Sequence, residues 1–75
     1  MMRDSIRNLA PALSGLEQSV IAALAEGLQS KEIAVAINRS KPTVEGYIRL
    51  LYVKFNARSR AHLVACAYRC GLLDE

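Results

Sequence analysis

The chain has 75 residues, of which 52% are hydrophobic, and its formal net charge is +3. This length suits one domain, and the hydrophobic fraction argues against a disordered chain. No stretch approaches the roughly 18 uninterrupted apolar residues that a membrane span requires, and the N-terminal residues lack the apolar run of a signal peptide. We therefore expect a reduced, cytoplasmic protein with no membrane partner.

The basic residues are concentrated in the middle of the sequence. Between Gln29 and Arg60 there are seven basic and two acidic residues, which gives this segment a net charge of +5 and leaves the rest of the chain at −2. Such a distribution suits a polyanionic partner. It also occurs on the solvated surfaces of domains that bind no polyanion, so the charge alone does not establish a partner.

The first predicted helix begins at Ser14. Ser14 and Glu17 have the spacing of a capping box, in which the serine side chain accepts from the N3 amide and the glutamate accepts from the N-cap amide. Apolar residues then recur at helical spacing up to Leu28. We expect Gly27 to end the helix in the left-handed conformation.

The second predicted helix is short. Its N-cap is expected at Ser30, Glu32 lies in its first turn, and Asn38 is expected to stop it. The short connection that follows leads directly into a third helix.

The third predicted helix has Ser40 as its N-cap, Pro42 in its first turn and Asn56 as its C-cap. Helical spacing assigns its apolar face to Val44, Ile48, Leu51 and Phe55. The opposite, outward face is assigned to Lys41, Glu45, Arg49 and Tyr52.

A fourth helix is predicted from Ser59 to about Cys70, with Gly71 as its stop. Strand signals are weak throughout, so these four helices predict an all-α fold. Two short helices joined by a tight turn, the second with a basic outward face, are the elements of a helix-turn-helix. In that motif the second helix fits the major groove of DNA, and the free amides at the start of the first helix attract the phosphate backbone.

Several short motifs occur in order along the chain, at spacings that need no insertion or deletion to match: Leu13-Ser14-Gly15-Leu16-Glu17, Leu24-Ala25-Glu26-Gly27-Leu28, Lys31-Glu32-Ile33-Ala34, Ser40 with Thr43-Val44, and Lys54-Phe55-Asn56-Ala57-Arg58-Ser59-Arg60-Ala61. Together they resemble the LuxR-type (GerE-type) DNA-binding domain of bacterial transcription regulators, from Leu13 to Leu73. The resemblance implies an N-terminal tail at 1–12 and a four-helix domain at 13–75. It also implies that the second and third helices form the helix-turn-helix, and that the fourth makes a two-fold dimer on double-stranded DNA.

By this resemblance the base-reading positions are Glu45, Gly46 and Arg49. An arginine can donate two hydrogen bonds to guanine, and a glutamate can accept one from cytosine. The alternative for Arg49 is a surface side chain held by Glu45 at i, i+4. The family commonly has a lysine at the position of Glu45, a larger residue at that of Gly46 and a basic residue at that of Pro42, so we expect a specificity unlike that of its relatives.

Phosphate contacts are expected at the helix starts and at the exposed hydroxyl and basic groups nearby. The candidates are Ser30, Lys31, Ser40, Lys41, Thr43, Tyr47, Arg58 and Arg60. For Arg58 and Arg60 the alternative is interaction with the last carbonyls of the third helix. Tyr52 is expected further along the outward face.

The dimer interface is expected on the fourth helix, at His62, Cys66, Tyr68 and Cys70. His62, Cys66 and Cys70 recur every four residues, an arrangement that could also supply metal ligands or thiols. The spacing lacks the CxxC loop of structural zinc sites, and cysteines usually act as small hydrophobic residues. We therefore expect neither a metal nor another cofactor.

The predicted function is that of a dimeric, sequence-specific transcription regulator, not an enzyme, because the chain has one histidine and no phosphate-binding glycine motif. The alternative is a protein-interaction module that pairs with a full-length LuxR-type regulator and blunts its DNA binding. The twelve residues before Leu13 cannot hold a sensor domain. We therefore expect constitutive action or a signal borrowed from a partner.

Overall fold

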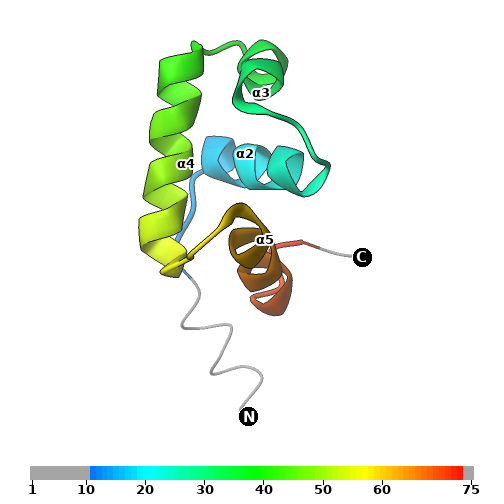
Figure 1. Ribbon diagram of the computed structural model, residues 1–75, viewed down its shortest axis with the longest axis vertical. Helices are drawn as coiled ribbons and strands as arrows, with labels where there is room; N and C mark the ends of the chain where they lie inside the picture. The colour runs from blue at the N-terminus through cyan, green and yellow to red at the C-terminus, as the bar shows by residue number, and fades with distance from the viewer. Residues whose placement is uncertain (1–10, 74–75) are drawn as a thin grey trace.

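A computed structural model of the chain describes residues 11–73, and this part of the chain consists of four helices without a strand. The helices are α2 (Gly15–Ala25), α3 (Ser30–Ile37), α4 (Lys41–Phe55) and α5 (Arg60–Arg69) (Figure 1). The predicted all-α architecture is confirmed. None of these helices is long and apolar enough to cross a membrane.

Three of the four helix starts agree with the sequence prediction. The side chains of Ser14, Ser40 and Ser59 each accept a hydrogen bond from the amide three residues later, which satisfies one of the free donors at a helix start.

The prediction for α3 was wrong by one residue, because the N-cap is Gln29 and Ser30 is the first helical residue. The Glu32 carboxylate accepts a hydrogen bond from the Gln29 amide at 2.9 Å. A carboxylate at N3 that reaches back in this way belongs to an N-cap three residues earlier. That partner fixes the cap at Gln29 rather than at the serine.

The helix ends also follow the sequence. Gly27 and Gly71 have φ of 89° and 80°, and Asn38 and Asn56 have φ of 56° and 51°. Glycine and asparagine are the residues that adopt this left-handed conformation most readily. Each of the four predicted stops is therefore confirmed.

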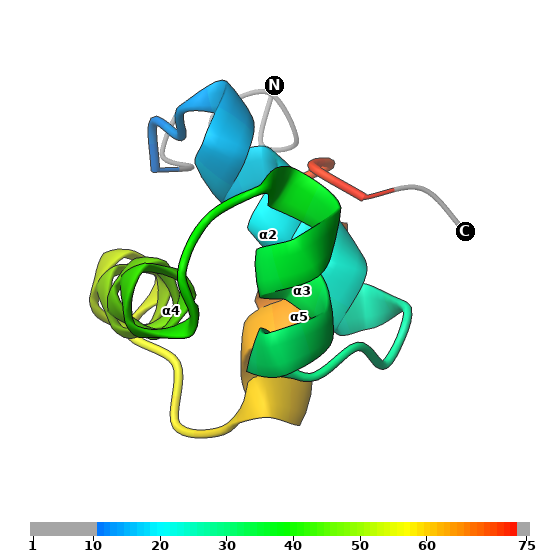
Figure 2. The same cartoon turned by 90° about the horizontal axis from the view of Figure 1, so that it is seen from above.

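The helix α2 lies at the centre of the fold. It packs against α3, α4 and α5, so that α3, α2 and α5 form a stack beside α4 (Figures 1 and 2). The buried apolar core draws on all four helices and consists of Val20, Ile21, Leu24, Ile33, Ala34, Val44, Leu51, Leu63 and Ala67. Tyr52 is half-buried and packs against this core, so its assignment to the outward face was wrong.

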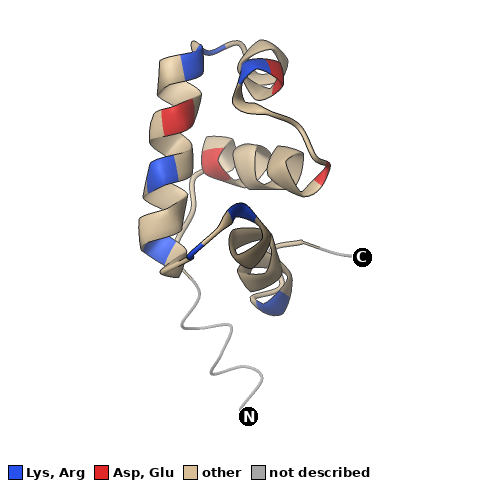
Figure 3. Ribbon diagram, viewed as in Figure 1, with Lys and Arg blue, Asp and Glu red and all other residues tan. Residues whose placement is uncertain are grey.

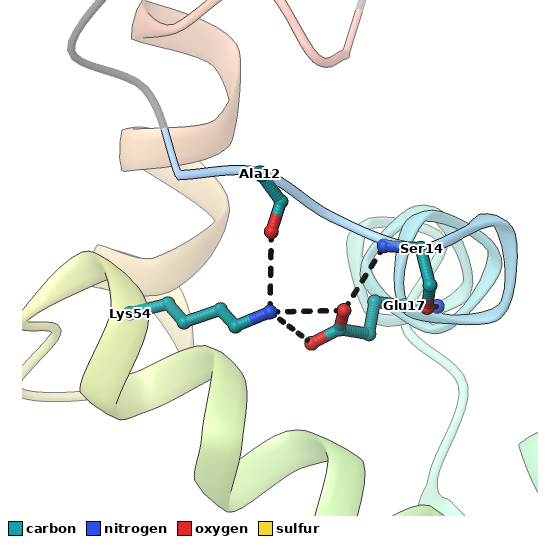
Figure 4. Close-up of polar contacts among 4 residues, drawn as sticks. All are labelled: Ala12, Ser14, Glu17 and Lys54. Atoms are coloured by element: carbon teal, nitrogen blue, oxygen red, sulfur yellow. Dashed lines mark hydrogen bonds and ion pairs between the residues drawn. The ribbon is translucent and has the colours of Figure 1, made fainter.

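An ion pair joins the start of α2 to the end of α4 (Figure 4). The Lys54 Nζ atom donates to both carboxylate oxygens of Glu17, at 3.0 and 2.9 Å, and to the Ala12 carbonyl at 3.1 Å. The Ser14 amide donates to the same carboxylate at 3.0 Å. The Ser14 amide first, and then Lys54, lower the pKa of Glu17 below its usual value.

Candidate nucleic-acid interface

The helices α3 and α4 form the predicted helix-turn-helix. Only Asn38, Arg39 and Ser40 separate them. The left-handed Asn38 reverses the chain, and the Arg39 amide donates to the Ala34 carbonyl at 2.9 Å. The Arg39 guanidinium donates to the carbonyls of Asn38 and Ile37, at 3.0 and 3.4 Å. These hydrogen bonds cap the end of α3 and fix the direction in which α4 starts.

The helix α4 has a buried face and an outward face. Val44 and Leu51 are fully buried, whereas Lys41 and Arg49 are exposed and Glu45 is half-exposed. Figure 3 shows the outward charges as bands along α4, with one acidic band between basic ones. The predicted base-reading residues therefore lie on a part of the surface that the core does not use.

Glu45 and Arg49 form no ion pair with each other in the described part of the chain. Instead, an Arg49 Nη2 atom lies 3.9 Å from the position that a Cβ atom would have at Gly46. The guanidinium thus lies beside the bare backbone of Gly46. The alternative in which Glu45 holds Arg49 is not the arrangement found here.

The start of α4 carries three of the predicted phosphate-binding residues. The Ser40 hydroxyl donates to the Thr43 hydroxyl at 2.9 Å and accepts from the Thr43 amide at 3.2 Å. Because the Thr43 oxygen acts as an acceptor in this pair, its own proton is available to a ligand. Lys41 is exposed beside these hydroxyls in sequence and carries the positive charge of the first turn of α4.

At the start of α3, Ser30 is half-buried and Lys31 is exposed. The Glu32 carboxylate already lies against the Gln29 amide. One of the free amides at this helix start is therefore engaged within the protein, and Lys31 supplies the cationic group.

Arg58 and Arg60 differ in their surroundings. The Arg58 side chain is exposed, while its amide donates to His62 Nδ1 at 3.0 Å. The Arg60 Nη2 atom donates to the carbonyls of Leu24, at 3.0 Å, and Leu28. These carbonyls lie at the end of α2. The predicted alternative for Arg60, interaction with the last carbonyls of the third helix, was therefore wrong about the helix.

Tyr47 is half-buried and packs partly against the core. Its ring therefore has a structural role, and the hydroxyl is the part of the side chain left to consider for a phosphate.

The predicted dimer residues of α5 fall into two groups. Tyr68 is 39% exposed, whereas His62, Cys66 and Cys70 are half-buried. The exposed face that contains Tyr68 also carries Ala61, Ala65 and Arg69, and the sequence reasoning missed its alanines. Among residues 11–73 no three His, Cys, Asp or Glu side chains come together as metal ligands.

Two outward residues of α4 were also missed. Leu50 is 43% exposed and Val53 is 76% exposed. They follow Gly46 by four and seven residues, a helical spacing that places all three on one face. This periodicity was the available signal, but the apolar character of Leu50 and Val53 did not suggest an outward position.

Comparisons with known proteins identify the family of the chain. A family model described as bacterial regulatory proteins, luxR family, matches residues 11–67. The probable transcriptional regulator ycf29 of Cyanophora paradoxa is 42% identical over 57 residues, which are 76% of this chain and 27% of that protein. The response regulator Rre1 of Synechocystis sp. is 40% identical over 58 residues, 77% of this chain and 25% of that protein.

A second ycf29 protein, from Porphyra purpurea, is 36% identical over 63 residues, 84% of this chain and 30% of that protein. The chain thus matches only 25% to 30% of the length of these curated relatives. No solved structure matches the chain significantly.

Proposed function

Because the chain belongs to the luxR family of bacterial regulatory proteins, we propose that it regulates transcription by binding DNA as a dimer, with α4 in the major groove. The family is one of regulatory proteins and not an enzyme class. The observation that carries the proposal is the outward face of α4, where Arg49 is exposed and not paired with Glu45. A helix of this width fits the major groove of B-DNA.

The base contacts proposed are those of Glu45, Gly46 and Arg49. The Arg49 guanidinium is free to donate two parallel hydrogen bonds to guanine, and Glu45 is placed one helical turn earlier to accept from a cytosine amino group. Gly46 adds no side chain, which allows α4 to approach the bases closely at this point.

The phosphate contacts proposed surround this face. Lys31 and Lys41 supply charge at the two helix starts, and Thr43 has a hydroxyl proton to donate. The remaining candidates are Ser30, Ser40, the Tyr47 hydroxyl and Arg58. Arg60 is a weaker candidate, because one of its terminal nitrogens already donates to two α2 carbonyls.

The dimer contact proposed is the outward face of α5. Tyr68 is its large exposed side chain, and the exposed alanines at 61 and 65 permit close approach of a second helix. His62, Cys66 and Cys70 are half-buried beside this face. A two-fold contact through α5 would place two α4 helices on two half-sites of a palindromic sequence.

The test is DNA selection from a random-sequence pool, followed by fluorescence anisotropy at two salt concentrations. A palindromic site with salt-dependent affinity is expected. Arg49→Ala should weaken binding to that site at least tenfold, whereas Arg69→Ala, which removes the same charge from the last turn of α5, should have a smaller effect. Arg49→Lys should keep the salt dependence but lose discrimination for guanine, because a lysine cannot form the two-pronged contact.

The dimer is tested separately by Ala65→Arg, which introduces a large charged side chain on the exposed face of α5. It should weaken binding to a two-half-site duplex much more than binding to a single half-site. Absence of an enriched sequence, or an Arg49→Ala variant with unchanged affinity, would refute base reading. The domain would then be better described as a module that pairs with a larger luxR-type regulator.

A further inference from the structure

The centre of the outward face of α4 is a row of uncharged residues. Pro42, Gly46, Leu50 and Val53 are spaced by four, four and three residues, so they are neighbours along the helix surface. Pro42 is exposed, and Leu50 and Val53 are 43% and 76% exposed. None of these four side chains can donate or accept a hydrogen bond.

Gly46 makes a gap in this row. Apart from the adjacent residues and the backbone of α4 itself, a Cβ atom at this position would have one neighbour within 4 Å, the Arg49 Nη2 atom at 3.9 Å. The space toward Pro42 and Leu50 is therefore open. The row thus contains a gap one side chain deep, with an apolar residue on either side and the Arg49 guanidinium at its edge.

This arrangement has a specific counterpart in DNA. The edges of base pairs in the major groove present hydrogen-bond donors and acceptors, together with one apolar group, the C5-methyl of thymine. Polar edges placed against Pro42 and Leu50 would lose their hydrogen bonds with water and gain none. A methyl group placed there would stabilise the complex, because the apolar surfaces of the methyl group and of the two side chains would both leave water.

We propose that this row reads thymine: the C5-methyl group of a thymine enters the gap over Gly46, between Pro42 and Leu50, in the same half-site as the guanine contacted by Arg49. Val53 extends the apolar surface toward the end of α4. The inference rests on the proposed function, since it assumes that the outward face of α4 enters the major groove. It adds that specificity depends on a methyl contact as well as on hydrogen bonds.

The experiment replaces each thymine of the selected duplex by deoxyuridine, one position at a time, and measures affinity by anisotropy. Deoxyuridine lacks only the methyl group and keeps every hydrogen-bonding atom of thymine. Burial of one methyl group corresponds to about a fourfold change in affinity. One thymine per half-site should therefore show about a fourfold loss on this replacement.

Two variants connect the methyl effect to the gap. Leu50→Gln removes one apolar wall, and Gly46→Gln fills the gap with a polar side chain, while both introduce a residue that favours helix formation. Val35→Gln is the matched control, because Val35 is an 80% exposed apolar residue on α3. The deoxyuridine effect should disappear in the two α4 variants and remain fourfold in the control.

The outcomes separate the inference from the proposed function. Wild-type protein that selects no DNA sequence would refute the proposed function and the inference together. Selective binding to a site without thymine, or without any deoxyuridine effect, would leave DNA reading intact and overturn the methyl contact. A deoxyuridine effect that persists in both α4 variants would also overturn it, because the methyl group would then lie against another part of the protein.

Discussion

Replacing Lys54 by methionine would remove the cation that holds the carboxylate of Glu17 while keeping most of the side-chain volume. The Glu17 side chain is only 7% exposed, and that of Lys54 is 28% exposed. Without Lys54 the carboxylate keeps the hydrogen bond from the Ser14 amide, but it loses both contacts with the ammonium group. A buried charge that loses its partner in this way is strongly destabilising.

The free energy of unfolding should fall by about 2–3 kcal/mol. Larger losses are known for ion pairs that are more completely buried than this one. A domain of this length is expected to have a total stability of about 4–11 kcal/mol. The change should therefore lower the melting temperature by about 8–24 °C. Thermal and urea unfolding, followed by far-ultraviolet circular dichroism, would measure both quantities.

Glu17→Gln provides the matched variant, since glutamine can occupy the same position of a capping box. In the double variant no charge is left without a partner, so its loss of stability should be smaller than the sum of the two single losses. Additive losses, or a Lys54→Met variant as stable as the wild type, would refute the argument that the ion pair holds α4 on α2.

The hydrogen bond from the Ser14 amide and the ion pair with Lys54 make the stability of the protein depend on acid. The pKa of Glu17 is lowered in the folded chain relative to its ordinary value of 4.5. The stabilisation is therefore present above that value and is lost as the pH falls through the lower, folded pKa. Urea unfolding across this acid range should show the wild type losing more stability than the Glu17→Gln variant, and parallel curves would contradict the assignment.

Other predictions concern the helix ends. Asn56→Ala should cost about 1–2 kcal/mol in thermal unfolding, because alanine resists the left-handed conformation, whereas Asn56→Gly should cost far less; equal losses would contradict this. Ser59→Ala should lower stability by about 1 kcal/mol through loss of the α5 cap, measurable by urea unfolding, and no change would show that the cap is dispensable. Arg60→Ala should lower stability by about 1–2 kcal/mol, since the Leu24 and Leu28 carbonyls lose their donor. At a temperature where the variant is fully folded, its DNA affinity should change less than that of Arg49→Ala, and a larger loss would show that Arg60 binds phosphate.

The sequence predicted the helix boundaries well because most of them depend on local chemistry. A serine that accepts from an amide three residues later, or an asparagine in the left-handed conformation, acts within one helical turn. The exception is the start of α3, where the sequence predicts Ser30 as the cap and the structure has its neighbour Gln29.

The long-range contacts could not be predicted in the same way. The partner of Lys54 lies 37 residues earlier, and the carbonyl acceptors of Arg60 lie 36 and 32 residues earlier. No local spacing identifies such partners, since they depend on how the helices pack. The assignment of Tyr52 to the outward face was wrong for the same reason. The angular position of a residue around one helix does not show how far a neighbouring helix extends over it.

The division of α4 into two faces has a consequence for how such a domain diverges. Gly46, Arg49 and Val53 have no place in the buried core, which α4 enters through Val44 and Leu51. If α4 reads DNA as proposed, selection on the fold and selection on the recognised sequence act on different side chains of one helix. Under the proposed function, new operators would become accessible through substitutions that leave the scaffold unchanged, and a library randomised at the outward positions should consist mainly of folded proteins.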